Sequence, residues 1–376
     1  MLCSIFESGI KRIQFVVLNL CLWQNAKAHL KQQVRKGVIS MKKTFRMRLL
    51  ALCLVASMSV NLCACQTKKQ TNKKDTKTQL TMVLDWTPNT NHTGLYVAEQ
   101  KGYFADEGLE VEIVLPPDDG ATDMVVSGNA EFGIDAQDNL AEEFAGDQNI
   151  NVTAVAAILQ HNTAGLISST DQGIDSPGKL QDHTLATNDT LFRQKVIQTL
   201  VESDGGDFGR VTLLSSYIDD VVSALRSDIQ CAWINYEWGG IQCEQAGLVT
   251  TFLPFRQLDE QFDYYSPVII ANNKFLTKHP DVARKFLKAV KKGYEYAIKK
   301  PEKAAEILCS SVPDLDERLI KGSQEYLKDC YIDDAAQFGV FDADRWNMFY
   351  QWVNEQHLYD QEIPENTGFT NEYIAD

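Results

Sequence analysis

The chain has 376 residues, of which 44% are hydrophobic and 23% are charged, a composition typical of globular proteins and not of disordered, collagenous or coiled-coil chains. The length favours two domains over one. The net charge of −15 argues against a phosphate backbone as the main partner, so we expect no nucleic-acid binding.

The charge is divided unevenly along the chain. Ten of the 36 Lys and Arg residues, but only one of the 51 Asp and Glu residues, fall within residues 1–64, so that residues 65–376 carry a net charge of −24. A basic leader ahead of an acidic body is typical of a targeting segment.

The segment that begins at Met41 reads as an export signal. A basic stretch ending at Arg48 precedes an apolar stretch, Leu49 to Val60, which is short for a membrane span. Met41 is the more natural start, so residues 1–40 are interpreted as a misassigned extension. This apolar stretch and its flanks predict a signal peptide over residues 41–64.

The end of the signal, Leu-Cys-Ala-Cys at residues 62–65, resembles a bacterial lipobox. In a lipoprotein, Cys65 becomes the mature N-terminus and carries the lipid. The alternatives are an ordinary secretory signal and an N-terminal membrane anchor. Residues 65–78 are polar and rich in Thr, Lys and Gln, which predicts a flexible tether between a lipid anchor and the folded body.

Strands and helices alternate over the first part of the body. Short apolar runs separated by helical patterns are typical of βαβ units and a mainly parallel sheet. Strands are predicted at 80–84, 111–115, 131–134, 152–159, 184–186, 211–214, 232–234 and 267–271. Helices are predicted at 94–100, 119–127, 139–145, 191–203 and 219–226, and over most of the chain from Pro280 onward.

This repeated pattern predicts two α/β lobes and a helical C-terminal region. The first lobe is predicted to comprise 79–166 and 268–376, and the second 167–267. Such folds bind ligands at the carboxyl ends of strands and between domains. We therefore searched for polar and aromatic residues where strands end.

The loop after the first strand, Asp85 to His92, holds an aromatic ring, amides, an acid and a histidine. Trp86 can stack on a flat ring, while Asn89 and His92 can hydrogen-bond to its edges. The alternative is a turn with Trp86 packed in the core.

A second candidate segment, Trp233 to Gly240, also follows a strand. Tyr236 can supply a stacking face, and Glu237 can accept a hydrogen bond from an exocyclic amine. The alternative is the start of a helix with Glu237 in its first turn.

Three further polar segments follow predicted strands. They contribute His161 and Asn162, Asp135 and Asn139, and Asn188. For each segment a structural role is the alternative: a hydrogen-bonded histidine at 161, or a helix N-cap at 188–190.

Signatures of catalysis are absent from the sequence. It contains no GxSxG, HExxH or GxxxxGK[ST] motif, and no GxGxxG after a strand. Cysteines 231, 243, 309 and 330 in the body lack zinc-site spacing, so we expect no metal and no cofactor. Their disulfide state is left open.

The quoted segments also resemble a known family. LDWTPNTNH, GLYVAEQKGYFADEGLEVEI and GATDMVVSGNAEFGI are similar to the N-terminal half of NMT1/THI5-like proteins, and WINYEWGGIQCEQAGL and FTNEYIAD to later parts. The resemblance covers about residues 78–376. It implies a type II periplasmic-binding-protein fold with two α/β lobes around a cleft.

The family contains two kinds of protein. Eukaryotic members are pyrimidine synthases that consume a histidine and pyridoxal phosphate and need iron. Bacterial members are solute-binding lipoproteins that deliver a thiamine pyrimidine precursor to an ABC importer. This chain lacks the synthase's Cys-rich cluster at 262–266, and Asp135 and Asn139 align with a synthase Lys and His.

These departures and the lipobox imply the bacterial kind. We expect a monomeric, non-enzymatic, lipid-anchored protein on the extracytoplasmic face, with ABC permease and ATPase subunits as partners. The expected ligand is a small heteroaromatic molecule, a formylaminopyrimidine- or hydroxymethylpyrimidine-type precursor. Riboflavin, a sulfonate, nitrate and synthase activity are the alternatives, and the absence of Arg and Lys from the proposed cleft loops argues against a sulfonate. The expected ligand-binding residues are Trp86, Asn89, His92, Asp135, Asn139, His161, Asn162, Asn188, Tyr236 and Glu237.

Overall fold

The structure, a computed structural model, describes residues 77–118, 120–146, 149–188, 190–216, 218 and 220–374. The predicted leader, Cys65 and nearly all of the tether lie outside the described residues. Within the described ranges, no helix has both the length and the apolar character needed to cross a membrane.

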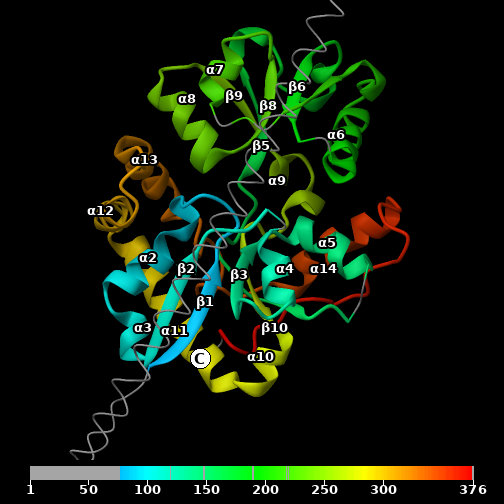
Figure 1. The fold of residues 1–376 in the computed structure, drawn as a ribbon. Helices are drawn as coiled ribbons and strands as arrows, with labels where there is room; N and C mark the ends of the chain where they lie inside the picture. The colour runs from blue at the N-terminus through cyan, green and yellow to red at the C-terminus, as the bar shows by residue number, and fades with distance from the viewer. Residues whose placement is uncertain are drawn as a thin grey trace, which may run out of the picture. The chain divides into compact units, whose positions relative to one another are not determined.

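The first sheet is built around the N-terminal βαβ units (Figure 1). Its strand order is β2-β1-β3-β10-β4, with β1 parallel to β2 and β3, and β10 antiparallel to β3 and β4. Its strands are β1 (Thr78–Val83), β2 (Leu109–Val114), β3 (Phe132–Asp135), β4 (Val152–Ala157) and β10 (Val268–Asn272).

The second sheet repeats this plan. Its order is β7-β6-β8-β5-β9, with β6 parallel to β7 and β8, and β5 antiparallel to β8 and β9. Its strands are β5 (Ala164–Ser169), β6 (Thr184–Thr187), β7 (Thr212–Ser215), β8 (Cys231–Asn235) and β9 (Thr250–Pro254). The fourth strand in each order, β10 in the first sheet and β5 in the second, is antiparallel to its neighbours. It is also the first strand that the chain forms after it crosses from the other sheet.

We call the first sheet and its helices lobe 1, and the second sheet and its helices lobe 2. The chain changes sheet between Ala157 and Ala164, and again between Pro254 and Val268. The predicted exchange at 166/167 thus falls inside β5, and the predicted return at 267/268 falls at the start of β10. Strands β5 and β9 are absent from the predicted strands. Strand β5 is buried along nearly its whole length and β9 is half-buried throughout, so neither shows an alternation of apolar and polar residues.

Helices cover both faces of the lobe 1 sheet (Figure 1). One face packs on α2, α3 and α11, and the other on α4, α5 and α14. The lobe 1 helices are α2 (Thr93–Gln100), α3 (Tyr103–Asp106), α4 (Ala121–Val126), α5 (Gln137–Gly146), α10 (Asn273–Lys278), α11 (Pro280–Lys299), α12 (Pro301–Ser311), α13 (Glu317–Leu327) and α14 (Ala343–Glu355). The lobe 2 helices are α6 (Leu191–Ser203), α7 (Val221–Leu225), α8 (Ile241–Gln245) and α9 (Phe255–Leu258).

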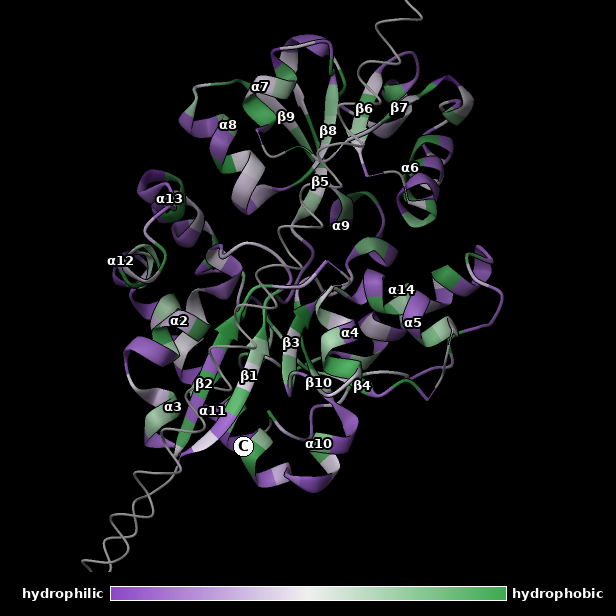
Figure 2. Cartoon of the chain, in the orientation of Figure 1, coloured by the Kyte–Doolittle hydropathy of each residue, from purple (hydrophilic) through white to green (hydrophobic). Residues whose placement is uncertain are grey.

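Apolar strands and amphipathic helices account for this layering. Strands β1 and β3 contain green, apolar stretches in Figure 2, while the helices around them carry purple turns. In α11 the apolar side chains face the sheet, and Lys288 extends outward to pair with Glu107 at 2.8 Å. Gly293 of α11 lies against Gly94 of α2, where an added Cβ would be 2.0 Å from the Gly94 carbonyl oxygen. This close packing fixes α2, and with it the loop that precedes α2.

Candidate functional site

A cavity of about 460 Å³ is lined by residues of both lobes, a volume suited to a small organic ligand. Lobe 1 contributes the segment after β1, and lobe 2 contributes the ends of β6, β7 and β8 with the residues that follow them. Carboxyl ends of parallel strands are the usual ligand site of open α/β sheets. The lining residues are Asp85, Trp86, Thr87, Asn89, Thr90, Asn91, Thr187, Asn188, Arg193, Ser216, Ile218, Val221, Trp233, Ile234, Asn235, Glu237, Trp238, Gly239 and Gln242.

The lobe 1 wall is held by a network of local hydrogen bonds. Asn89 Oδ1 accepts from the Asn91 backbone N at 2.9 Å, and the Asn89 backbone N donates to His92 Nδ1 at 3.1 Å. His92 Nε2 lies 2.7 Å from Asp85 Oδ1. Because Nδ1 accepts, Nε2 carries the proton and donates to Asp85. His92 is fully buried and does not line the cavity, so its role in the structure is to shape the loop.

The same loop is anchored from beneath by buried hydroxyl groups. Tyr294 of α11 donates to the Asn91 carbonyl oxygen at 2.6 Å, and Tyr331 donates to the Thr90 carbonyl oxygen at 2.9 Å. The hydroxyl groups of Thr90 and Ser323 lie 2.5 Å apart. The Asn91 side chain is therefore presented to the cavity from a rigid backbone.

Asn91 and Glu237 meet across the cavity from opposite lobes. Asn91 Nδ2 donates to Glu237 Oε1 at a long 3.4 Å. The other acceptors of the two side chains, Asn91 Oδ1 and Glu237 Oε2, are buried and have no hydrogen-bond partner among the described residues. Unpaired buried acceptors cost about 1–3 kcal/mol each, so this arrangement favours a ligand that brings N–H donors.

Glu237 lies in a π-helical turn, Tyr236–Gly240, between β8 and α8. Such turns are rare and are often found at functional sites. Burial raises the pKa of Glu237, and the neighbouring polar groups of Thr163, Asn91 and Asn235 oppose that shift. The predicted alternative, a helix start with Glu237 in its first turn, is therefore what the structure shows. Glu237 nevertheless lines the cavity.

Aromatic faces come from three tryptophans that line the cavity. Trp86 is 48% exposed in the loop of lobe 1, whereas Trp233 of lobe 2 is 7% exposed. Trp238 follows in the π-helical turn. The Arg193 guanidinium lies over the Trp233 ring, 4.5 Å from its centroid, so a cation also reaches the lining.

Arg193 corrects one expectation. We expected no Arg or Lys to face an anionic ligand, because the predicted cleft loops contain none. Arg193 lies outside those loops, in the first turn of α6, where Thr190 caps the helix. The strand-turn-helix pattern from β6 to α6 could have predicted that Arg193 lines the cavity, since residues at such junctions lie on the ligand-binding side of the sheet.

The sequence profile of a family described as NMT1/THI5 like matches residues 89–304. The chain belongs to the NMT1/THI5-like family. It is 26% identical to the formylaminopyrimidine-binding protein of Halalkalibacterium halodurans, over 82% of this chain and 94% of that protein. It is 23% identical to the 4-amino-5-hydroxymethyl-2-methylpyrimidine phosphate synthase of Legionella pneumophila, over 80% of this chain and 93% of that one.

Solved structures share the fold at low identity. The alkanesulfonate-binding protein of Xanthomonas axonopodis pv. citri superposes with a TM-score of 0.59 at 10% identity, covering 78% of this chain and 98% of that one. The predicted family and the periplasmic-binding-protein fold of two α/β lobes are confirmed. The relatives include a binding protein and synthases, so family membership alone does not decide between binding and catalysis.

Of the ten residues predicted to bind the ligand in this NMT1/THI5-like protein, the cavity brings together Trp86, Asn89, Asn188 and Glu237. The Asn89 amide is already engaged within its own loop, since Nδ2 also donates to the Thr87 carbonyl oxygen at 3.1 Å. The other six residues lie outside the lining.

Tyr236 points away from the cavity. Its ring packs against Phe252 and Tyr326, with centroids 4.7 Å and 5.1 Å apart, and its hydroxyl donates to Glu244 at 2.5 Å. A Cβ on Gly240 would lie 2.5 Å from the Tyr236 ring, which therefore covers this glycine. The aromatic faces in the lining belong to tryptophans instead, because neighbouring residues of a helical turn point in different directions.

Asp135 and Asn139 hydrogen-bond to each other at the start of α5. Asp135 Oδ1 accepts from the Ala136 backbone N and from Asn139 Nδ2, each at 2.8 Å, and Oδ2 accepts from the Thr122 hydroxyl. Burial raises the pKa of Asp135. With its oxygens engaged in this way, the pair supports the helix and does not reach the cavity.

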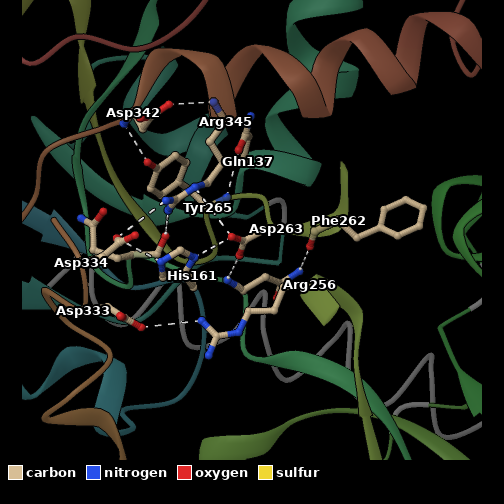
Figure 3. Close-up of polar contacts among 12 residues, drawn as sticks. Gln137, His161, Arg256, Phe262, Asp263, Tyr265, Asp333, Asp334, Asp342 and Arg345 are labelled. Atoms are coloured by element: carbon tan, nitrogen blue, oxygen red, sulfur yellow. Dashed lines mark hydrogen bonds and ion pairs between the residues drawn. The ribbon is translucent and has the colours of Figure 1, made fainter. Parts of the chain in front are cut away.

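His161 and Asn162 lie in the crossover from lobe 1 to lobe 2 and bind the return crossover (Figure 3). The Asn162 backbone N donates to Asp263 Oδ1 at 2.9 Å, and its Nδ2 donates to the Phe262 carbonyl oxygen at 2.8 Å. His161 Nδ1 lies 2.5 Å from Asp263 Oδ2, and Nε2 lies 3.1 Å from Asp334. These residues thus join the two crossovers that form the hinge.

The charges of this hinge cluster favour the protonated form of His161. Asp263, Asp333 and Asp334 face Arg256 and Arg345, which lie 3.7 Å to 3.9 Å from them. One nitrogen of His161 and carboxylate oxygens of Asp333 and Asp334 lie within 4.8 Å of one another. The arginines already neutralise much of the negative charge that a metal ion would need. The hydrogen bond to Asp263 is the main cause that raises the pKa of His161.

His161 should therefore make folding stability depend on pH. Because its pKa is raised, its contribution is complete below about 6.5, the value for an unfolded histidine, and is lost as pH rises through the folded-state value. His161→Gln should lower the free energy of unfolding by ~1–2 kcal/mol at pH 5.5 and by less at pH 8.5. Urea unfolding at both pH values measures the difference, and exposed His357→Asn is the control. An equal loss at both pH values would contradict this role.

A second contact joins the lobes away from the cavity. Gln245 Nε2 of α8 donates to the Arg318 carbonyl oxygen at 2.8 Å, and Arg318 Nη2 donates to the Gln245 carbonyl oxygen at 3.2 Å. A Cβ on Gly322 of α13 would lie 2.7 Å from Gln245 Nε2 and 2.9 Å from Ile241. Helix α13 thus packs closely on α8 only because residue 322 is glycine.

Gly322→Leu should hold the two lobes apart. Although residue 322 does not line the cavity, this substitution should lower ligand affinity about tenfold. Calorimetric titration measures the affinity. Helix propensity should not lower stability, because leucine is the better helix former by roughly 0.8 kcal/mol. Glu325→Leu, on an exposed position of the same helix, is the matched control. Unchanged affinity in Gly322→Leu would show that this contact is not needed for closure.

Proposed function

We propose that this protein is the solute-binding component of an ABC importer and that its ligand is an aminopyrimidine precursor of thiamine. The observation that carries this proposal is the pair of unpaired acceptors, Asn91 Oδ1 and Glu237 Oε2, that two lobes present in one aromatic cavity. An exocyclic amine supplies N–H donors, and a flat ring can stack on Trp86. The similarity to a formylaminopyrimidine-binding protein supports the same ligand class.

Binding and selectivity then follow from lobe closure. Closure removes water from the cavity, so a ligand without the amine leaves the acceptors unpaired at ~1–3 kcal/mol each. Domain closure around a ligand also creates a distinct shape that a permease can recognise. We infer a monomer that delivers its ligand to permease and ATPase subunits, with no chemical step.

A ligand screen tests the proposal. Calorimetric titration and thermal shift should show binding of 4-amino-5-hydroxymethyl-2-methylpyrimidine and of its formylamino analogue, and weaker binding of a des-amino pyrimidine. Riboflavin, an alkanesulfonate and nitrate are the competing ligands. Tight binding of one of these, with none of the aminopyrimidines, would overturn the assignment.

The position of Arg193 supports the alternative that the ligand is an anion. Its guanidinium lines the cavity above Trp233, where it can meet an anionic or carbonyl group. Arg193→Gln should abolish binding of a sulfonate if that is the ligand. Under our proposal, the variant retains the aminopyrimidine and loses affinity mainly for ligands with a carbonyl or anionic substituent.

Synthase activity is the enzymatic alternative, because synthases are among the relatives. We propose that the protein does not perform this reaction, since Asp135 and Asn139 stand where the synthases carry a Lys and a His and are hydrogen-bonded to each other. Incubation with pyridoxal phosphate and iron, followed by mass spectrometry, should show no pyrimidine product and an intact chain. Formation of product would refute the binding-only role.

The location outside the cytoplasm rests on the lipobox. Cys65→Ser should move the protein from the membrane fraction to the soluble fraction, because each acyl CH₂ contributes ~0.8 kcal/mol to membrane binding. Fractionation after a high-salt wash measures this change. Retention of the variant in the membrane fraction would favour the alternative of an N-terminal membrane anchor.

A further inference from the structure

Glu237 is a buried acid in a cavity that Asp85 and Arg193 also line. It is 2% exposed, and no ion pair of Glu237 occurs among the described residues. The titratable groups that face it are Tyr326, Cys330 and Tyr331, from α13 and the segment after it. None of these supplies a positive charge. A carboxylate in such a place is disfavoured relative to the neutral acid.

The hydrogen-bonding pattern of an aminopyrimidine edge explains what this acid can do. The edge presents an N–H donor on the exocyclic amine beside a ring nitrogen lone pair. A carboxylate offers acceptors only, so one of its oxygens would face that lone pair. A carboxylic acid offers a donor and an acceptor side by side and therefore matches the edge.

The atoms of the cavity can complete this pairing. Glu237 Oε1 already faces Asn91, and Oε2 has no partner among the described residues. The two N–H groups of the amine can bind Asn91 Oδ1 and Glu237 Oε1, which leaves Oε2 to share a proton with the ring nitrogen. Every acceptor and donor of the edge is then satisfied.

On the basis of the proposed function, we propose that the protein binds its aminopyrimidine together with one proton, held between Glu237 Oε2 and a ring nitrogen. When Glu237 is ionised in the free protein, this proton comes from solvent, and no bond within the ligand breaks. The raised pKa of Glu237 agrees with this arrangement. Once free Glu237 and the ring nitrogen of the free ligand are both deprotonated, affinity should fall about tenfold for each further pH unit.

Calorimetric titration with 4-amino-5-hydroxymethyl-2-methylpyrimidine tests the proposal. Titrations from pH 6 to pH 9, in pairs of buffers such as phosphate and Tris whose ionisation enthalpies differ, should show for the wild type a proton uptake per ligand that rises toward one as free Glu237 ionises. Glu237→Gln presents an amide donor and acceptor with no titratable proton, so it should bind without proton uptake and with an affinity independent of pH. His161→Gln should retain the uptake, which separates Glu237 from the hinge histidine.

The outcomes are distinct. Wild-type binding without proton uptake, or with a constant affinity from pH 6 to pH 9, would overturn the shared proton while leaving the proposed function intact. Equal uptake in Glu237→Gln would place the proton elsewhere and also overturn it. If the wild type binds no aminopyrimidine, the proposed function itself fails. The wild-type buffer comparison remains decisive even where the variant binds weakly.

Discussion

Glu237→Leu should weaken aminopyrimidine binding about a hundredfold and at the same time stabilise the ligand-free protein. The loss follows from removing both a donor and an acceptor at the ligand edge, ~1–3 kcal/mol in total, where ~1.4 kcal/mol corresponds to tenfold. The gain follows because the burial cost of the acid, which is the main cause of its raised pKa, outweighs the interactions with Asn91, Thr163 and Asn235 that leucine loses.

Two measurements on the same variant distinguish binding from structure. Calorimetric titration gives the affinity, and the melting temperature without ligand should rise by about 2 °C for ~1 kcal/mol. Glu244→Leu, a nearby exposed acid that contacts Tyr236 and not the cavity, is the matched control and should leave affinity nearly unchanged. A fall in melting temperature with unchanged affinity would mean that Glu237 serves the fold alone.

Trp86→Ala should lower the affinity about tenfold to thirtyfold with little change in the stability of the empty protein. The indole is 48% exposed without ligand, so its removal leaves no large cavity in the core. In the complex it would supply an aromatic face worth ~0.5–1.5 kcal/mol beyond the area that it buries.

Titration and thermal melting of Trp86→Ala separate these effects, and Trp86→Phe should recover much of the binding. Leu115→Ala, which is 59% exposed and outside the cavity lining, is the control for loss of a surface apolar side chain. A large drop in melting temperature with no change in affinity would support the reading of Trp86 as a packing residue.

Local patterns in the sequence were enough to predict most elements of the fold. The strand and helix periods place β1, β3, β6 and α6 close to their observed bounds, because apolar alternation and capping act over a few residues. The polar segments at the carboxyl ends of strands likewise directed attention to Trp86 and Glu237, which do line the cavity.

Which of several neighbouring side chains faces the cavity depends on the tertiary structure and could not be predicted from the sequence. The phase of the π-helical turn directs Glu237 and Trp238 inward and Tyr236 outward, a choice that the sequence order does not encode locally. Arg193 reaches the cavity only because α6 starts beside β8, and Asn91 is set by hydroxyl groups from more than 200 residues away.

His161 is a predicted ligand-binding residue whose structural role could not be predicted from the sequence. Its partners Asp263 and Asp334 lie 102 and 173 residues further along the chain, so no spacing in the sequence could reveal that both ring nitrogens are engaged at the hinge. Most strands and helices, the family and the two-lobe plan could be predicted from the sequence, since these depend on short-range periodicity and on matching segments. The pairing of buried polar groups depends on contacts that exist only when the lobes are folded together, and that pairing decides which side chains remain available to a ligand.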